Sequence, residues 1–188
     1  MTAVILFHHV QGLNDDVRAF ADELRAAGHE VHTPDVFEGQ TFATLPDGIA
    51  HIQEIGFDTV LERGRSAVEG LPAEVVYIGI SLGVMPAQLL AQTRPGARGA
   101  VFLQSAVPPA AFDSPWPAAV PAQIHLTERD PEVLPPNSDL AAAHAFAGTE
   151  EGVELFLYPG DEHLFWNYDD DAAALLKERV LAFVANSG

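Results

Sequence analysis

The sequence has no cysteine and few basic residues. Of its 188 residues, nine are Lys or Arg and 27 are Asp or Glu, which gives a formal net charge of −18. The absence of cysteine excludes disulfides, thiolate metal sites and a cysteine nucleophile. A surface this acidic repels nucleic acid and anionic lipid, so we expect neither nucleic acid nor a membrane as a partner.

Long uninterrupted apolar runs are also missing. No stretch of about 18 apolar residues is free of charged or helix-breaking residues, so we expect no transmembrane helix. No basic segment precedes the first apolar run, which starts almost directly after Met1, so we expect no signal peptide and a cytoplasmic location. Hydrophobic residues make up 48% of the chain, which is ample material for a core, and its length fits one domain over residues 1–188.

Short apolar segments alternate with segments of helical periodicity. The expected strands are residues 3–9, 29–33, 74–80, 98–103, 121–127 and 153–158. The expected helices are residues 14–28, 82–92, 138–147 and 171–186, together with a broken helical region over 46–70. The proline-rich segment 104–123 is expected to be a loop. This alternation predicts an α/β fold with a three-layer sandwich, in which about six mostly parallel strands are flanked by helices.

Residues 79–83 read Gly-Ile-Ser-Leu-Gly and lie between an expected strand and an expected helix. This G-x-S-x-G pattern in that context is typical of a nucleophile elbow, whose tight turn leaves no room for side chains at the two glycines. The turn lifts the hydroxyl of Ser81 above the edge of the sheet, at a helix N-terminus that favours a developing oxyanion. The alternative interpretation is a glycine-rich turn in which Ser81 only caps the helix.

A nucleophilic serine needs a base, and in elbow proteins the acid and then the histidine follow the serine along the chain. His125 falls inside an expected strand and His144 inside an expected helix, so we expect both to be structural. His163 comes five residues after the last expected strand, at the carboxyl edge of the sheet, where ligands bind in open α/β sheets. His163 is therefore the candidate base, with a surface loop histidine as the alternative.

The candidate acid is Asp130, which follows the fifth expected strand at the same edge. From there its carboxylate can accept the imidazole N–H and hold the tautomer that the reaction needs. Glu128 is the reserve acid. Asp161 and Glu162 are less suitable, because a loop neighbour seldom points correctly at the ring of its own histidine. In the alternative interpretation Asp130 only caps a turn.

Two backbone N–H groups are expected to bind the oxyanion. One belongs to Leu82, directly after the serine, and the other to Val10, in the loop after the first strand. His8 and His9 precede Val10, but adjacent strand residues face opposite ways, so they cannot easily bind one metal ion together. We therefore expect no metal site.

Four segments, which follow one another over nearly the whole chain, are FHHVQGLNDDVRAFADELRAAGHEVHTPDVFEG, GISLG, QIHLTERDP and YPGDEHLFW. On these segments the sequence resembles the dienelactone hydrolases of the α/β-hydrolase superfamily, in a short branch with serine at the elbow. The resemblance implies an α/β-hydrolase core without a large cap domain, a triad of Ser81, Asp130 and His163, oxyanion donors at Val10 and Leu82, and no cofactor.

The sequence departs from the family pattern at three places. Ser81 stands where well-studied members have cysteine, and His9 stands where they have a glutamate after the first strand. The segment after His163 lacks the arginine that helps those members to bind the carboxylate of the lactone. This last departure argues against dienelactone itself as the substrate.

The leading hypothesis is a serine hydrolase that cleaves a small ester, lactone or thioester through an acyl-enzyme on Ser81. The residues expected to wall the substrate pocket are His9, Phe112, Trp116, Phe165 and Trp166, with ordinary packing as the alternative role.

Two other functions stay open. The first is a non-catalytic ligand-binding protein of the α/β-hydrolase fold with an idle triad. The second is a flavodoxin-like nucleotide or flavin binder, which the absence of G-x-G-x-x-G and of a Walker A lysine disfavours. Both a monomer and a homodimer are compatible with the sequence.

Overall fold

A six-stranded sheet forms the centre of the computed structural model, which describes residues 1–168 and 170–188. The strands are β1 (Ala3–Phe7), β2 (Glu30–His32), β3 (Val75–Ile80), β4 (Ala97–Leu103), β5 (Ala122–Thr127) and β6 (Val153–Tyr158). The α-helices are α1 (Asp15–Ala26), α2 (Leu45–Ile55), α3 (Phe57–Ala67), α4 (Val84–Thr93), α5 (Asp139–Thr149) and α6 (Asp171–Asn186). Short 3₁₀ helices are η1 (Ser81–Gly83), η2 (Pro109–Phe112) and η3 (Phe165–Asn167).

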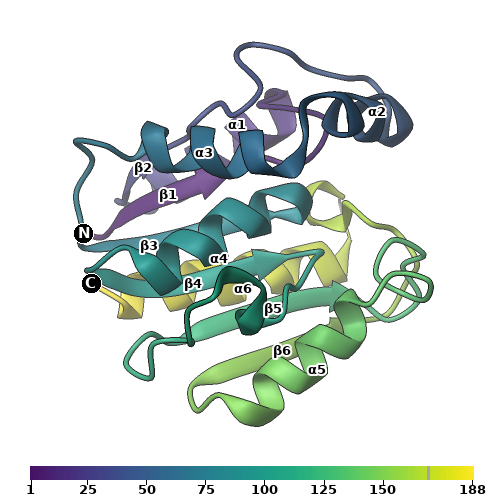
Figure 1. The fold of residues 1–188 in the computed structure, drawn as a ribbon. Helices are drawn as coiled ribbons and strands as arrows, with labels where there is room; N and C mark the ends of the chain where they lie inside the picture. Colours follow the sequence, from purple (N-terminus) through teal and green to yellow (C-terminus); the bar gives the residue numbers. More distant parts are fainter. Residues whose placement is uncertain (169) are drawn as a thin grey trace.

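All neighbouring strands pair in parallel, in the order β2-β1-β3-β4-β5-β6 (Figure 1). Their carboxyl ends therefore lie along one edge of the sheet. The chain leaves β1 for β2 on one side and later returns as β3 on the other side of β1. In open α/β sheets such a reversal of strand order opens a crevice in which ligands bind.

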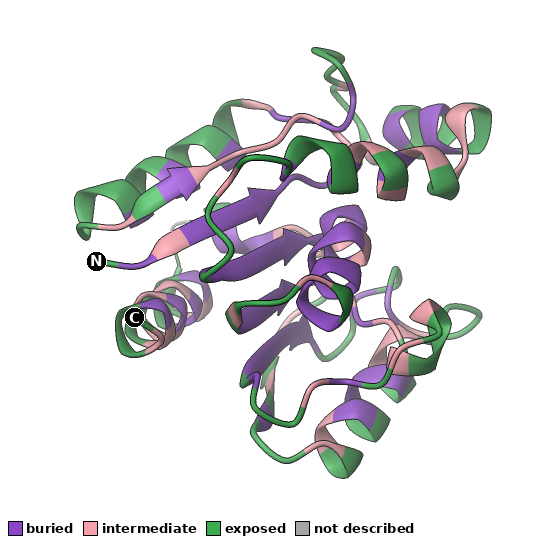
Figure 2. Cartoon of the chain, turned by 60° about the vertical axis from the view of Figure 1, so that its left-hand side comes forward, coloured by how far each residue is buried: buried purple, intermediate pink, exposed green. Residues whose placement is uncertain are grey.

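The sheet is buried on both faces, and its side chains alternate between two cores. Ile5 and Phe7 of β1 join the core under α2, α3, α4 and α5, whereas Val4 and Leu6 join the core under α1 and α6. Figure 2 shows the strands buried almost throughout, while the outer faces of α1, α3 and α6 are exposed. The predicted three-layer fold of about six parallel strands, without a large cap, is confirmed over the described residues.

The broken helical region resolves into α2 and α3, separated at Gly56. Gly56 has a φ of 80°, a left-handed conformation that ends α2 with a turn and that glycine adopts most easily. The expected start of α1 is confirmed as well, since the side chain of Asn14 accepts a hydrogen bond from the N–H of Val17 at 3.1 Å. Over the described residues, no helix combines the length and the apolarity needed to cross a membrane.

His125 of β5 is a core residue, as its position inside an expected strand predicted. Its ring is fully buried and lies between the Tyr158 hydroxyl, 2.8 Å from Nδ1, and the Gln123 side-chain oxygen, 3.2 Å from Nε2. Burial, with a smaller effect of the Arg179 charge, lowers the pKa of His125 to about 3. The ring is therefore neutral in the folded protein at any pH near neutrality.

The lowered pKa of His125 has a consequence for stability. Between about pH 6.5 and pH 3 the unfolded chain binds a proton that the folded chain does not, so the free energy of unfolding should fall as the pH falls through this window. In urea unfolding at a series of pH values, we expect His125→Asn to remove roughly 1 kcal/mol per pH unit from this slope. The exposed His144→Asn variant is the control and should keep the slope. An unchanged slope in His125→Asn would contradict the assignment.

Candidate active site

Ser81 occupies a strained turn directly after β3. Its φ is 51°, in the left-handed region that residues other than glycine rarely adopt. The turn is possible because two glycines flank it. A Cβ on Gly79 would collide with the backbone of Gly83, and a Cβ on Gly83 would collide with the carbonyl of Phe7 in β1. The predicted elbow geometry is therefore present, and it holds the Ser81 hydroxyl at the carboxyl edge of the sheet.

A continuous chain of hydrogen bonds joins Ser81, His163 and Asp130. Ser81 Oγ lies 2.8 Å from His163 Nε2, and His163 Nδ1 lies 2.6 Å from Asp130 Oδ2. Asp130 is fully buried, and the side chain of His163 is 10% exposed. With Nδ1–H donating to the carboxylate, Nε2 is left to accept the serine hydroxyl proton. The structure thus brings together the three residues that the sequence predicted, from the loops after β3, β5 and β6.

Backbone contacts fix the relative position of the acid and the histidine. The second oxygen of Asp130 accepts the N–H of Glu132 at 2.8 Å. The loop that carries His163 is bound to the end of β5, where the Thr127 hydroxyl donates to the carbonyl of Glu162 at 2.8 Å. The N–H of Arg129 donates to the carbonyl of Gly160 at 3.0 Å. Two loops far apart in sequence are therefore held at a fixed separation.

The other candidate acids lie elsewhere. Glu128 is exposed, on the strand end that leads to Asp130. The Glu162 carboxylate accepts a hydrogen bond from the Tyr168 hydroxyl at 3.0 Å, and Asp161 is exposed. Of the four acidic side chains considered from the sequence, only that of Asp130 contacts the ring of His163 in the described part of the chain.

The residues of the two expected oxyanion donors, Val10 and Leu82, line one cavity together with Ser81. Leu82 is the second residue of η1, so its N–H lies in the first helical turn, where backbone donors have no partner within the helix. Val10 lies in the turn after β1 and lines the same cavity as Ser81 and His163. Their role in binding an oxyanion stays a prediction.

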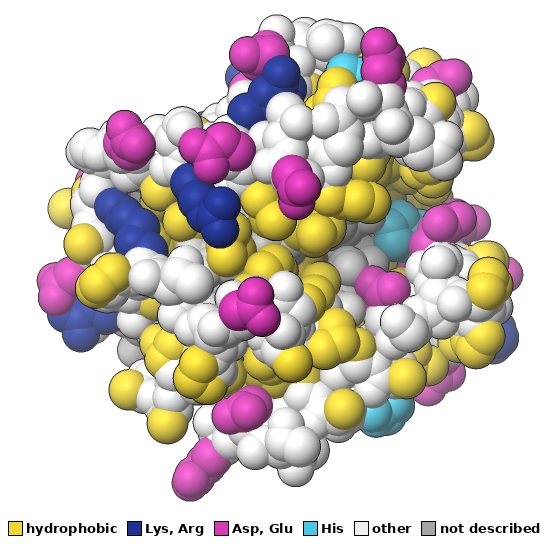
Figure 3. All heavy atoms as spheres, in the orientation of Figure 1, with side chains coloured by type: hydrophobic (Ala, Val, Ile, Leu, Met, Phe, Trp, Pro, Cys, Tyr) yellow, Lys and Arg dark blue, Asp and Glu magenta, His cyan; other side chains and the backbone are white. Residues whose placement is uncertain are grey.

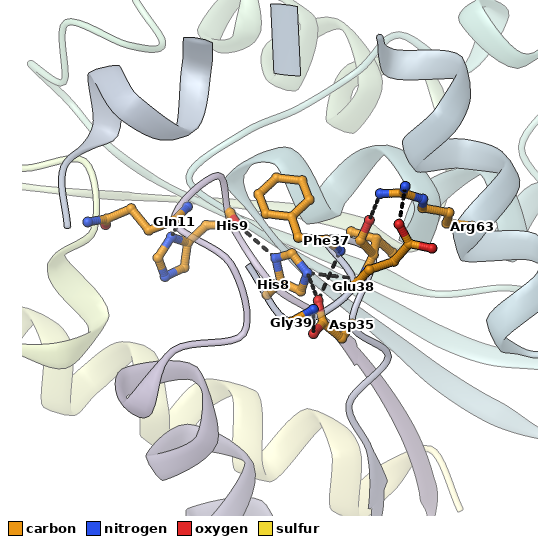
Figure 4. Close-up of polar contacts among 9 residues, drawn as sticks. His8, His9, Gln11, Asp35, Phe37, Glu38, Gly39 and Arg63 are labelled. Atoms are coloured by element: carbon orange, nitrogen blue, oxygen red, sulfur yellow. Dashed lines mark hydrogen bonds and ion pairs between the residues drawn. The ribbon is translucent and has the colours of Figure 1, made fainter. Parts of the chain in front are cut away.

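His8 anchors the loop that presents Val10 (Figure 4). The ring is fully buried, its Nδ1 lies 2.8 Å from the carbonyl of His9, and its Nε2 accepts the N–H of Val36 at 3.1 Å. The Nδ1–H must then donate to the His9 carbonyl. His8 therefore binds the loop after β1 to the segment after β2, and its buried ring fixes the backbone directly before Val10.

The segment after β2 is itself fixed by Asp35. Its carboxylate accepts the N–H groups of Phe37 at 2.9 Å and Gly39 at 2.7 Å. One carboxylate oxygen of Asp35 also lies 3.5 Å from Nε2 of His8 (Figure 4). On the other side of the segment, Arg63 of α3 donates to the carbonyl of Val36 at 2.9 Å (Figure 4).

His9 is buried and is not among the residues that line the cavity of Ser81 and His163. Its ring lies 5.3 Å from that of Trp166 between centroids, and its Nδ1 accepts the N–H of Gln11 at 3.2 Å. Burial, assisted by the neighbouring His8 and His163, lowers the pKa of His9 to about 3, so its ring is neutral. The expectation that His9 walls the substrate pocket is therefore wrong.

A cavity of about 440 Å³ opens beside Ser81 and His163. Figure 3 shows a hollow on this face of the molecule, with apolar side chains along it and a histidine and acidic side chains nearby. Its lining comes from the segments after β1, β4, β5 and β6, from η1, and from α2, α3, α4 and the start of α5. The lining residues are Val10, Leu45, Ile49, Phe57, Ser81, Leu82, Met85, Gln104, Ser105, Ala106, Val107, Pro108, Glu132, Asn137, Ser138, Asp139 and His163.

The aromatic residues that were expected to wall this cavity lie elsewhere. Trp116 is buried against Phe102 on the α5 side of the sheet, and its indole N–H donates to the carbonyl of Val120 at 2.8 Å. Phe165 and Trp166 are buried in the core on the opposite face of the sheet, which α1 and α6 cover. Phe112 ends η2, half-buried and outside the cavity lining.

Gly48 is a positioning residue that the sequence analysis missed. It lies in α2, and a Cβ at this position would collide with the carbonyl of Val10. The helix can therefore approach the candidate oxyanion loop only because position 48 has no side chain. A glycine inside a helical pattern, which costs stability relative to alanine, is the signal that could have revealed it.

The sequence and the fold both match known hydrolases. A sequence model described as the dienelactone hydrolase family matches residues 1–187. No curated protein gives a significant match.

Three solved structures illustrate the likeness of the fold. A dienelactone hydrolase-like promiscuous phosphotriesterase from metagenomic libraries is 17% identical with a TM-score of 0.74, over 99% of this chain and 86% of the other. A protein from Xanthomonas campestris, assigned to the α/β hydrolase superfamily, is 21% identical with a TM-score of 0.67, over 100% of both chains. An esterase domain from Rhodothermus marinus is 15% identical with a TM-score of 0.61, over 100% of this chain and 88% of the other.

The contact between α2 and the Val10 loop can be tested with two glycine variants. Gly48→Ala should displace the loop and lower kcat/KM for ester hydrolysis roughly tenfold, the scale of partial loss of one oxyanion donor. Gly148→Ala, in α5, is the matched control because a Cβ there meets nothing within 4 Å. It should keep full activity and gain about 0.5–1 kcal/mol of stability. Unchanged activity in Gly48→Ala would show that the contact does not position the loop.

Proposed function

The chain belongs to the dienelactone hydrolase family, and we propose that it cleaves a small ester, lactone or thioester through an acyl-enzyme on Ser81. The observation that carries this proposal is the hydrogen-bond chain from Ser81 through His163 to Asp130, whose first two residues line a cavity. Nucleophilic acyl transfer needs three groups: a hydroxyl, an imidazole ring whose one nitrogen faces that hydroxyl, and a buried carboxylate that faces the other ring nitrogen.

In the first half-reaction Ser81 Oγ attacks the substrate carbonyl carbon while His163 Nε2 takes the hydroxyl proton. Asp130 stabilises the imidazolium that forms. The carbonyl oxygen becomes an oxyanion, which the N–H groups of Val10 and Leu82 would bind. The tetrahedral intermediate then expels the alcohol or thiol, which receives the proton from His163, and the acyl group stays on the serine.

In the second half-reaction water takes the place of the alcohol. His163 removes a proton from the water as the oxygen attacks the acyl carbon, and returns the proton to Ser81 Oγ as the carboxylic acid leaves. No step needs a metal or an organic cofactor. The left-handed backbone of Ser81 supports this cycle, because it directs the hydroxyl away from the strand and towards the ring of His163.

Covalent labelling tests the nucleophile. After reaction with a fluorophosphonate probe, we expect the intact mass to show a single adduct, which peptide mapping places on Ser81. The adduct should be absent from Ser81→Ala and greatly reduced in His163→Ala, because an unassisted serine hydroxyl is a weak nucleophile. Ser187→Ala, at the end of α6, is the control and should label like the wild type. Folded wild-type protein without an adduct would favour a ligand-binding protein with an idle triad.

The choice of Asp130 as the acid can be tested against its neighbour Glu128. We expect Asp130→Asn to lower kcat roughly 10³- to 10⁴-fold with little change in KM, because an amide at this position favours the wrong tautomer of His163. Glu128→Gln should keep wild-type kinetics, since its side chain is exposed. If Glu128→Gln lost activity and Asp130→Asn did not, Glu128 would be the acid.

A further inference from the structure

We propose that the cavity beside Ser81 selects substrates without a negative charge, namely esters and lactones whose acyl part carries an uncharged or cationic hydrogen-bonding group. This inference rests on the proposed function, since it names the substrate class of the same site. It follows from the lining of the cavity, in which we distinguish an apolar wall, made by residues of α2, α3 and α4, from a polar, acidic wall, made by Gln104, Glu132 and Asp139.

The apolar wall is built by α2 and α3, which follow β2, and by α4, which follows Ser81. Leu45 is the first residue of α2, and Ile49 lies one turn further along the same helix. Phe57 is the first residue of α3, and Met85 belongs to α4. Ile49 is 37% exposed and Phe57 is 52% exposed, and both belong to the cavity lining, as is typical of pockets that bind small molecules. A hydrocarbon segment of the acyl group would cover these side chains and remove them from water.

Gln104 marks the polar wall. It directly follows β4, its φ is 57°, and it is a fully buried residue that belongs to the cavity lining. Neither its side-chain oxygen nor its side-chain nitrogen has a hydrogen-bond partner among the described residues. A buried amide without partners is costly and uncommon in folded proteins. Together with the strained backbone, this indicates a group held ready to bind a ligand that donates or accepts hydrogen bonds.

Two carboxylates lie on the same wall. One oxygen of Asp139, at the start of α5, accepts the Ser105 hydroxyl at 2.5 Å and the N–H of Ala106 at 3.2 Å, which holds the segment after Gln104 in place. Glu132 follows the candidate acid Asp130, and its side chain is exposed. Among the described residues that line the cavity, none is Lys or Arg.

These charges decide which acyl groups can bind. An acyl group with a terminal carboxylate would meet the carboxylates of Glu132 and Asp139 without a cation to neutralise any of the three. The net charge of −18 on the chain adds a repulsion at longer range. Like charges that lie several ångströms apart near a protein surface are expected to lower affinity roughly ten- to hundredfold. A hydroxyl or ammonium group at the same position would instead donate hydrogen bonds to this wall.

A series of methyl esters with one chain length tests the proposal. The series is methyl hexanoate, methyl 6-hydroxyhexanoate, methyl 6-aminohexanoate and monomethyl adipate, which differ only in the terminal group. Hydrolysis is followed by titration of the released acid at pH 7.5 and 0.1 M salt. We expect kcat/KM for monomethyl adipate to be at least tenfold lower than for methyl hexanoate, and the hydroxyl and amino esters to equal or exceed methyl hexanoate. Similar values for the anionic and neutral esters would overturn the proposal.

Variants of the polar wall test its role independently of folding. A loss of folded protein lowers the activity toward every ester equally, so it leaves the ratio between two esters unchanged. For Glu132→Gln we expect the ratio of kcat/KM for monomethyl adipate to kcat/KM for methyl hexanoate to rise several-fold. The control is Glu151→Gln, which should leave this ratio unchanged because Glu151 lies at the amino end of β6, at the opposite edge of the sheet. Gln104→Leu should lower the ratio of hydroxyhexanoate to hexanoate hydrolysis several-fold. Unchanged ratios in both cavity variants would contradict a role for this wall.

The experiment also distinguishes failure of the inference from failure of the proposed function. If the wild type hydrolyses all four esters at equal rates and Ser81→Ala hydrolyses none, the serine mechanism stands and the selectivity is wrong. If no ester is hydrolysed and no probe labels Ser81, the proposed function is wrong and the inference falls with it.

Discussion

Parallel pairing of the strands is the constraint on which the candidate site depends. It places the carboxyl ends of β1, β3, β5 and β6 along one edge of the sheet, although the loops that follow them are up to about 150 residues apart in sequence. Ser81, Asp130 and His163 each come from a different one of these loops. Their hydrogen bonds of 2.6 and 2.8 Å exist because the register of the sheet fixes the distances between the loops.

Close contact between backbones is the second constraint. The elbow packs against the end of β1 at Gly83, and α2 packs against the loop after β1 at Gly48. The loop that presents Val10 is therefore enclosed between the elbow and a helix, and the buried ring of His8 binds it to the segment after β2. The site is held by packing and buried hydrogen bonds on several sides, which favours a fixed geometry over one formed only when substrate binds.

The sequence was sufficient to predict the fold and the three residues of the hydrogen-bond chain. Buried parallel strands have sequences that are short apolar runs, and residues just after such runs lie at the carboxyl edge of the sheet. Ser81, Asp130 and His163 could be selected because each follows such a run. His125 could be recognised as structural for the same reason, because it lies within a run and not after it.

The cavity wall could not be predicted in this way. Apolar character in a loop shows that a side chain will be buried, but not beneath which element, so Trp116 and Trp166 were placed at the substrate pocket although each packs in a core. The actual wall depends on how α2 and α3 lie over the sheet, which is a tertiary property. Gln104 carries no motif, and only its backbone conformation and its unpartnered amide distinguish it.

Trapping of the acyl-enzyme shows whether Ser81 is the nucleophile. A neutral ester such as methyl hexanoate is mixed with the enzyme, the reaction is quenched with acid during turnover, and the digested protein is examined by mass spectrometry. We expect a hexanoyl group on the peptide that contains Ser81, with its mass on the serine, and none in Ser81→Ala. Turnover without acylated Ser81, or with the acyl group on another residue, would contradict this role of Ser81.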